Sequence, residues 1–182
     1  MNIWKRNSFA IAAMVLMIAV GTLAGSHNTL MGMRNKASTI FIAGVRGDGI
    51  GIQGDLRERE GKAYDMVMIA RKYLPEDNAL IQNVLKARDA LNAASTVKGK
   101  AAANRALETA VKDLFDVLSG MTLSESDARY PQSLYTNFRS RGDTIGHDPY
   151  NAAAAGFNDV LAGFPAGVLG GISGVQPLEL FE

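Results

Sequence analysis

A basic start followed by a long uncharged run is the feature that most constrains this chain. Lys5 and Arg6 precede an apolar stretch from Phe9 to Ala24, and no Asp, Glu, Lys or Arg occurs from residue 7 to residue 33. A helix that crosses a bilayer needs about 20 mostly apolar residues. With its small, weakly polar neighbours the run reaches that length. The sequence therefore predicts a signal anchor, a membrane-spanning helix over residues 1–26.

The same run also fits a cleaved signal peptide. Such a leader has a basic start, an apolar core of about 7–15 residues and a small-x-small exit, which Ala19-Val20-Gly21 supplies. We favour the retained anchor because the apolar run continues past that exit. Either form normally exports the rest of the chain. We therefore expect a single-pass protein of the cell membrane whose residues 27–182 lie outside the cytoplasm, periplasmic or at the cell surface.

The composition excludes several classes of function. The chain has 182 residues, 19 Lys and Arg, 18 Asp and Glu, and no Cys. A formal charge of +1 gives too weak a field to gather nucleic acid. The lack of Cys excludes a disulfide scaffold, a thiolate zinc site and a cysteine nucleophile. His27 and His147 have no partners at metal-binding spacing. We therefore expect no catalytic residue, no metal and no cofactor, and so no enzyme.

Beyond the uncharged run, apolar residues recur every three or four positions, which is the spacing of one helical face. A helix is expected to run on through Leu30, Asp77 or Asn78 is expected to cap a later one, and Gly120 is expected to end another. The expected helical stretches are Leu56–Tyr73, Leu80–Leu91, Ala101–Leu118 and the Ala-rich Asn151–Leu161, with a polar break at Thr96–Lys100. The predicted fold class is all-α, an antiparallel bundle of three to four long helices plus a short C-terminal helix.

Two stretches are expected to be loops. Residues 43–55 belong to a Gly-rich region, and each Gly inside a helix costs about 0.5–1 kcal/mol relative to Ala. Residues 121–149 are polar and contain two prolines, which indicates a long connection. The expected organisation is an anchor at 1–26 and a bundle domain at 27–182. An apolar tail at 164–182 closes that domain, because Pro165 cannot continue the preceding helix.

Two short motifs leave alternative functions open. Gly49, Gly51 and Gly54 fit the G-x-G-x-x-G pattern, in which backbone amides at a helix N-terminus hold a pyrophosphate. They are weak candidates for nucleotide or small-ligand binding, because the region that should hold the second strand is helical instead. Arg46-Gly47-Asp48 and Arg141-Gly142-Asp143 spell the tripeptide read by adhesion receptors. We expect both copies to lie in solvated loops.

The tail carries the most specific pattern. Tyr150-Asn151, Phe157-Asn158 and Phe164-Pro165 precede a Gly-containing apolar stretch that ends in Phe181-Glu182. This pattern resembles the signature of the LemA family. The segment from His27 to Asn35 resembles the family motif just after its membrane segment, and the middle of the chain matches its middle helices. The Gly-rich region and the short stretch before the tail depart from the family pattern, as in a divergent or shortened member.

The resemblance implies a single N-terminal membrane segment, a soluble antiparallel bundle and no established enzymatic activity. It implies no catalytic residue. Its motif residues are expected to serve packing or contact: Asn28, Arg34, Tyr64, Tyr73, Arg88, Tyr150, Asn151, Phe157, Asn158, Phe164 and Pro165. The expected partners are the membrane, through the N-terminal helix, and another protein or further copies of this chain.

Overall fold

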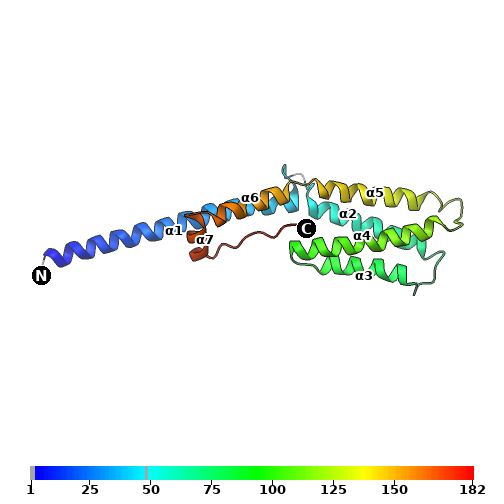
Figure 1. The fold of residues 1–182 in the computed structure, drawn as a ribbon, viewed down its shortest axis with the longest axis horizontal. Coiled ribbons are helices and arrows are strands. Elements are labelled where there is room, and N and C mark those ends of the chain that lie inside the picture. The colour runs from blue at the N-terminus through cyan, green and yellow to red at the C-terminus, as the bar shows by residue number, and fades with distance from the viewer. Residues whose placement is uncertain (1–2, 48) are drawn as a thin grey trace. The chain divides into compact units, whose positions relative to one another are not determined.

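Every regular element in the described part of the chain is a helix. The computed structural model describes residues 3–47 and 49–182. The helices are α1 (Ile3–Ala43), α2 (Ile52–Ala70), α3 (Ala79–Ala93), α4 (Val97–Ser119), α5 (Tyr130–Gly146), α6 (Tyr150–Ala162) and α7 (Ala166–Ser173) (Figure 1). The predicted all-α fold class is confirmed. The helix expected through Leu30 is α1, which runs unbroken from the uncharged region to Ala43.

The chain divides into two compact units. The first consists of residues up to Ser38 together with Ala152–Leu178, and the second consists of Thr39–Asn151 together with Glu179–Glu182. Helices α1 and α6 therefore each contribute to both units. This division differs from the expected organisation, in which one bundle domain begins at residue 27.

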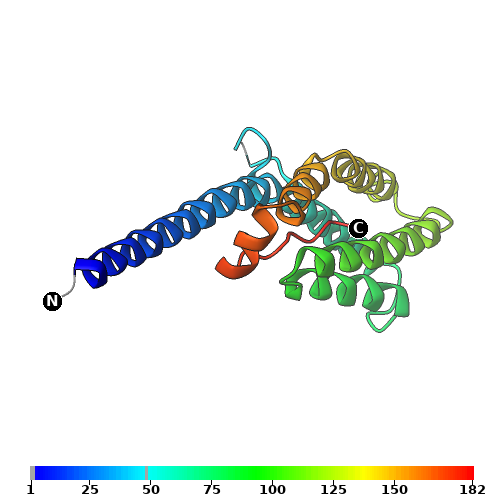
Figure 2. The ribbon, with the colours of Figure 1, turned by 60° about the vertical axis from the view of Figure 1, so that its left-hand side comes forward.

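The second unit is a bundle of α2, α3, α4 and α5. Helix α2 packs against the other three, and α4 packs against both α3 and α5. Short connections at alternate ends make consecutive helices antiparallel (Figures 1 and 2). Apolar residues at helical spacing form the core. The fully buried ones include Leu56, Met66, Ile81, Leu107, Val111, Leu114, Leu118 and Phe138.

Polar side chains set the ends of the bundle helices. The Asn78 side-chain oxygen accepts a hydrogen bond from the Leu80 amide at 2.9 Å, so the predicted cap at the start of α3 is confirmed. Gly120 ends α4, also as predicted. The Thr96 hydroxyl accepts a hydrogen bond from the Gly99 amide at 3.0 Å and begins α4 earlier than expected. Residues 97–100 are therefore helical, and the predicted polar break is shorter.

Helix α5 contradicts the expected connection at residues 121–149. It occupies Tyr130–Gly146 and buries Phe138 and Ile145, which are seven residues apart on one face. Pro131 does not prevent the helix because it lies in the first turn, where a backbone N–H has no helical partner. Similarly, the expected Gly-rich loop at 43–55 is shorter. Helix α2 begins at Ile52 and continues through Gly54 and Gly61.

The first unit packs α6 and α7 against α1 around a small apolar core. Leu30, Phe157 and Val175 are buried, and Leu161 and Ala166 pack against them. The chain turns after Phe164-Pro165, as Pro165 predicts, and α7 comes next (Figure 1). Gly174 ends α7 with φ +77°, a conformation that favours glycine. The residues beyond it have no regular secondary structure and follow an extended course (Figure 1).

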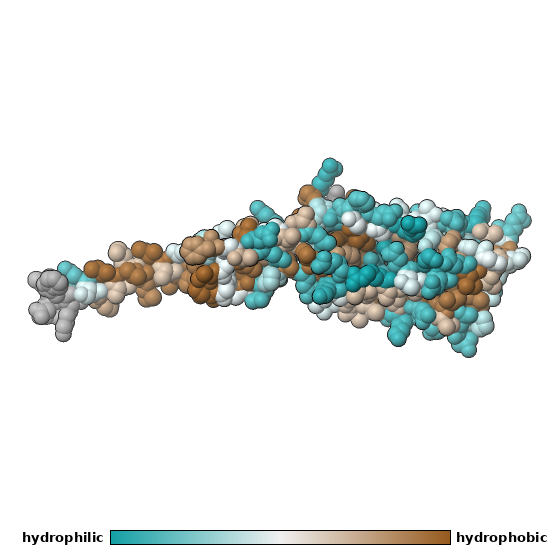
Figure 3. All heavy atoms as spheres, viewed as in Figure 1, coloured by the Kyte–Doolittle hydropathy of each residue, from teal (hydrophilic) through white to brown (hydrophobic). Residues whose placement is uncertain are grey.

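Helix α1 is long and apolar enough to cross a membrane over residues within Asn7–Ala43. Large apolar side chains such as Phe9, Leu16 and Ile18 are exposed on it. In the space-filling view, apolar residues cover much of the helix on the face shown (Figure 3). An anchor and a signal sequence share these properties.

Candidate functional site

Two asparagines of α6 hold the extended C-terminal segment. The Asn151 side-chain amide donates to the carbonyl oxygen of Phe181 at 3.0 Å, and its oxygen accepts from the Phe181 amide at 2.7 Å. Asn158 binds Leu178 in the same two-way manner, at 2.9 and 2.8 Å. Each asparagine side chain therefore pairs with both the N–H and the C=O group of one backbone residue, as a neighbouring strand would.

The spacing of these asparagines matches the spacing of their partners. Seven residues along an α-helix rise about 10.5 Å. Three residues of extended chain cover about 10 Å. Asn151 meets Phe181 in the second unit and Asn158 meets Leu178 in the first, so the partners follow in reverse order along the chain.

Tyr150 fixes the end of the segment within the second unit. It is buried, and its hydroxyl donates to the carbonyl oxygen of Glu179 at 2.7 Å. Its ring meets the Phe41 ring edge-on, with centroids 5.1 Å apart, and Phe41 also contacts the Phe181 ring at 6.0 Å. The Glu179 carboxylate accepts a hydrogen bond from the Lys98 amide at 2.9 Å, at the start of α4.

Within the first unit, the other motif residues differ in exposure. The Arg34 guanidinium donates to the carbonyl oxygen of Gln176 at 3.0 Å, and Phe157 is buried in the small core. Asn28 and Pro165 are exposed, and Phe164 is 90% exposed. The structure therefore packs Phe157 but leaves the second aromatic residue, Phe164, without a protein surface to cover it.

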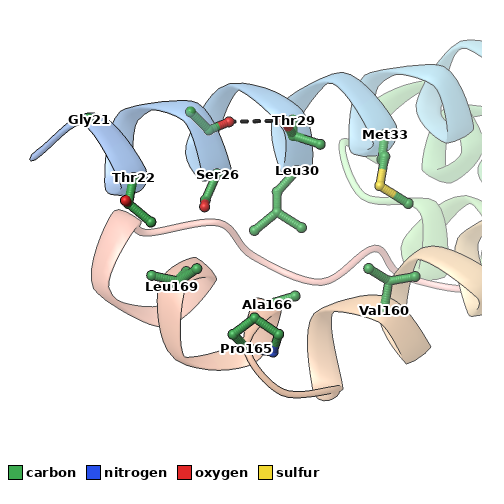
Figure 4. Close-up of a pocket in the computed structure, with 11 residues that line it drawn as sticks. Gly21, Thr22, Ser26, Thr29, Leu30, Met33, Val160, Pro165, Ala166 and Leu169 are labelled. Atoms are coloured by element: carbon green, nitrogen blue, oxygen red, sulfur yellow. Dashed lines mark hydrogen bonds between the residues drawn. The ribbon is translucent and has the colours of Figure 1, made fainter. Parts of the chain in front are cut away.

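An apolar groove lies in the first unit beside the turn between α6 and α7 (Figure 4). Its volume is about 480 Å³. Val160 lies opposite Met33, and Leu169 lies near Thr22 and Ser26. Its lining consists of Gly21, Thr22, Gly25, Ser26, Thr29, Leu30, Met33, Val160, Pro165, Ala166 and Leu169. No ionisable residue lines this groove, so its surface suits an apolar chain.

Tyr64 and Arg88, which match the family's middle helices, join α2 to α3. The Arg88 guanidinium donates to the backbone oxygen and to the carboxylate of Glu60, both at 3.2 Å. It also lies over the Tyr64 ring, 4.7 Å from the centroid. The Asn92 amide donates to the same Glu60 carboxylate. This cluster connects the two helices through side chains that face each other.

Tyr73 belongs to a second polar cluster, where α2 ends. Its hydroxyl donates to Asp127 at 2.7 Å and accepts from the Ser124 amide at 3.0 Å. The Lys72 ammonium donates to the other Asp127 oxygen at 2.9 Å. The hydrogen bonds from Lys72 and Tyr73 hold the pKa of Asp127 below its ordinary value, and the bond to Asp127 raises the pKa of Lys72.

Arg59 is a structural residue that the sequence analysis does not single out. It is 1% exposed, donates to Glu108 at 3.2 Å, and lies over the Phe138 ring at 4.1 Å. Burial lowers the pKa of Arg59, an effect that the Glu108 carboxylate opposes. Its position three residues after Leu56 and four before Ala63 places it on the apolar stripe of α2. That spacing is the signal in the sequence.

Two glycines of the G-x-G-x-x-G pattern allow the backbone to pack closely, and the third, Gly49, has a positive φ. A Cβ on Gly51 would lie 2.5 Å from the Ile40 oxygen, and one on Gly54 would lie 2.8 Å from the Gly49 oxygen. Gly49 has φ +82°. The pattern comes after helix α1, and no strand occurs in the described residues. The strand that a dinucleotide-binding turn requires is therefore missing before it.

The two Arg-Gly-Asp copies have different surroundings. Arg46 and Gly47 lie in the loop after α1, and Asp48 lies outside the described residues. Arg141-Gly142-Asp143 lies inside α5, so the expectation of a loop is wrong for this copy. There Arg141 pairs with Asp55 at 3.1 Å, and Gly142 lies directly against the Arg59 guanidinium. This Arg-Gly-Asp copy therefore contributes to the packing of α5 against α2.

These features define an α-helical bundle with an asparagine-held C-terminal segment and an N-terminal helix of membrane-spanning length. A profile of the LemA family matches residues 50–182, which include α2 to α7 and all the tail motifs. The chain belongs to the LemA family. No curated protein matches it at a significant level. Among the described residues, no group of three His, Asp or Glu side chains is placed to hold a metal ion.

Proposed function

We propose that this chain is a membrane-anchored scaffold or interaction module that binds another protein or a second copy of itself. In this proposal α1 crosses the cell membrane and the bundle of α2–α5 lies outside the cytoplasm. The module works by binding and not by catalysis. The observation that carries the proposal is the apolar surface of α1, which is exposed around Phe9 to Val20 and continues without a helix break towards the bundle.

The charged side chains between the bundle helices support a scaffold. Arg59 pairs with Glu108, Arg88 with Glu60, and Arg141 with Asp55. Each pair joins two different helices, so these groups hold the bundle together. An interaction module needs such a preorganised surface, because a rigid binding face loses less entropy on association.

Helix α2 offers a contact face for a partner. Tyr64 and Met68 are exposed and lie four residues apart, on one side of the helix. Tyrosine and methionine are enriched at protein interfaces, where they supply apolar area. We therefore place the partner contact on this side of α2.

Photocrosslinking in native membranes tests this function. The full chain would carry a photoreactive residue at Met68 in one variant and at Asp113, exposed on α4, in a matched control. The proposal expects a covalent adduct with a second copy or with one reproducibly identified membrane protein from Met68 only. No adduct from Met68, combined with a monomeric mass of the detergent-solubilised chain, would overturn it.

The location of the bundle can be tested because the chain has no cysteine of its own. Lys86 is exposed on α3, so Lys86→Cys offers an accessible thiol. A maleimide that cannot cross membranes should label it in intact cells. Labelling only after lysis would place the bundle in the cytoplasm.

A further inference from the structure

The turn between α6 and α7 lies in a second uncharged stretch of the chain. No Asp, Glu, Lys, Arg or His occurs between Asp159 and Glu179. This stretch includes the whole of α7 and the preceding Phe164-Pro165. It is therefore the part of the first unit, apart from α1, that could enter an apolar medium without burying a charge.

The contacts of α7 locate it along α1. Leu169 and Ala166 line the groove with Thr22 and Ser26 of α1 (Figure 4). A hydrocarbon core of about 30 Å takes up about 20 helical residues, so a span that starts after Arg6 reaches about residue 27. Helix α7 therefore lies beside the last turns of the span. Arg34 is the first charged residue after the uncharged run of α1, and it donates to the Gln176 carbonyl oxygen. The chain beyond α7 therefore returns to the end of that run.

One side of this turn is apolar and uncovered. Phe164 is 90% exposed, Val168 57% and Ile172 67%. Val168 and Ile172 are four residues apart, so they share a face of α7, and the exposed Phe164 lies in the turn just before this helix. The opposite side, with Leu169 and Gly170, faces the groove and Leu30. An apolar patch of this kind marks a contact with a protein or a membrane.

We propose that the α6–α7 turn, residues 163–173, inserts into the bilayer beside α1, in the leaflet nearest Arg34. Phe164, Val168 and Ile172 contact phospholipid acyl chains, and an acyl chain also fills the groove against Thr22 and Ser26. The occupant is lipid because α7 lies against Thr22 and Ser26, at the level where the exposed apolar side chains of α1 end at Val20. The inference rests on the membrane anchor of the proposed function.

Fluorescence quenching in lipid bilayers tests the insertion. Single-cysteine variants of the full chain, F164C and I172C, would carry an environment-sensitive nitrobenzoxadiazole label in phosphatidylcholine–phosphatidylglycerol vesicles. I18C marks the span, and the exposed positions of K36C and A152C mark the aqueous side. We expect blue-shifted emission and quenching by doxyl-labelled phosphatidylcholine at 164 and 172, as at 18. We expect iodide to quench only 36 and 152.

The outcomes separate the insertion from the anchor. Doxyl quenching at 18 but iodide quenching at 164 and 172 would overturn the insertion and leave the anchor intact. Iodide quenching at 18 would overturn both. Phe164 and Ile172 are exposed, so their replacement removes no core packing, and circular dichroism would verify the helices. If V168C formed a disulfide between copies while 164 and 172 escaped doxyl quenching, the face would be a protein interface and the proposal would be wrong.

Discussion

Arg59 shows how a single charged residue can belong to a core. Its guanidinium lies between the Phe138 ring and the Glu108 carboxylate, and Gly142 leaves room for it on α5. Arg59→Ala removes this packing, and the neighbouring helices can only partly close the space. We expect the free energy of unfolding to fall by about 2–4 kcal/mol, measured by urea unfolding of the detergent-solubilised chain.

Glu108→Gln is the matched control for Arg59. The Glu108 side chain is 55% exposed, and glutamine keeps an oxygen that can accept the hydrogen bond. Its effect should be smaller than that of Arg59→Ala. Equal losses would show that the ion pair, and not the packing of Arg59, stabilises this part of the bundle.

The tail asparagines give a prediction that depends on one atom. Asn151→Asp replaces the amide donor by an oxygen, which then faces the Phe181 carbonyl oxygen. We expect the local opening free energy of the tail to fall by about 1–3 kcal/mol, seen as faster amide hydrogen exchange at residues 178–182. Asn83→Asp, at an exposed position of α3, makes the same change of charge and should leave this exchange unchanged.

The sequence predicts part of this site. The interval of seven residues places Asn151 and Asn158 on one face of a helix. It does not show that their partners are backbone groups of residues 178 and 181, because a backbone partner leaves no trace in the side chains. Phe164 shows the converse limit, since its apolar character predicts burial and the protein leaves it uncovered.

At the scale of elements, Gly51 at the start of α2 and Gly61 in its middle have opposite roles. A Cβ at Gly51 would collide with backbone atoms of Ile40, Phe41 and Gly44, whereas a Cβ at Gly61 would meet nothing within 4 Å. Gly51→Ala should therefore lower the free energy of unfolding by more than about 1 kcal/mol. Gly61→Ala should raise it by about 0.5–1 kcal/mol, because alanine loses less backbone entropy in a helix.

The same urea unfolding series measures both glycine variants. Equal changes of the same sign in the two variants would contradict the close packing at Gly51.

The cluster at the end of α2 predicts a dependence of stability on pH. The pKa of Asp127 is lowered by its bonds to Lys72 and Tyr73, so its carboxylate stabilises the folded state above the ordinary Asp pKa of about 3.9. This contribution is lost as the pH falls through the lowered value. Asp127→Asn should lower the melting temperature at neutral pH. In this variant the melting temperature should then decrease less as the solution is made acidic. Asp65→Asn, at an exposed position of α2, should keep the slope of the parent chain.

Helix α5 shows why sequence patterns alone were insufficient at this scale. Gly142 and Gly146 lower helix propensity, and the apolar residues Phe138 and Ile145 are too few to give a clear stripe. Contacts with other helices compensate, since Phe138 packs on Arg59 and Arg141 reaches Asp55. In α4, by contrast, apolar residues repeat at every turn, and the sequence predicted most of the helix.

For the whole molecule, the central prediction concerns α1. Leu16 is exposed in the middle of the uncharged run, and an arginine there would have to enter the hydrocarbon at a cost of about 3 kcal/mol. Leu16→Arg should move part of the protein from the membrane pellet to the supernatant after an alkaline wash. Thr109→Arg, at an exposed position of α4, should not. Complete release of the unaltered chain would show that α1 is no anchor.

The family and the fold class were accessible from the sequence because both depend on local patterns. The tail motif and the helical periodicity can each be recognised within a short stretch of the sequence. The division into two units was not accessible. It depends on residues far apart in the chain, such as Leu30 with Phe157 and Val175, whose contact no local pattern specifies.

The uncharged part of α1 exceeds what a hydrocarbon core requires. From residue 7 to residue 33 it contains 27 residues (33 − 7 + 1), or about 40 Å of helix, against a core of about 30 Å. The surplus follows the turns at Thr22 and Ser26 that α7 lies against. Lipids with longer acyl chains would cover more of this surplus, and shorter ones would uncover it. With α1 as the proposed anchor, bilayer thickness would set how much of this helix the lipid covers.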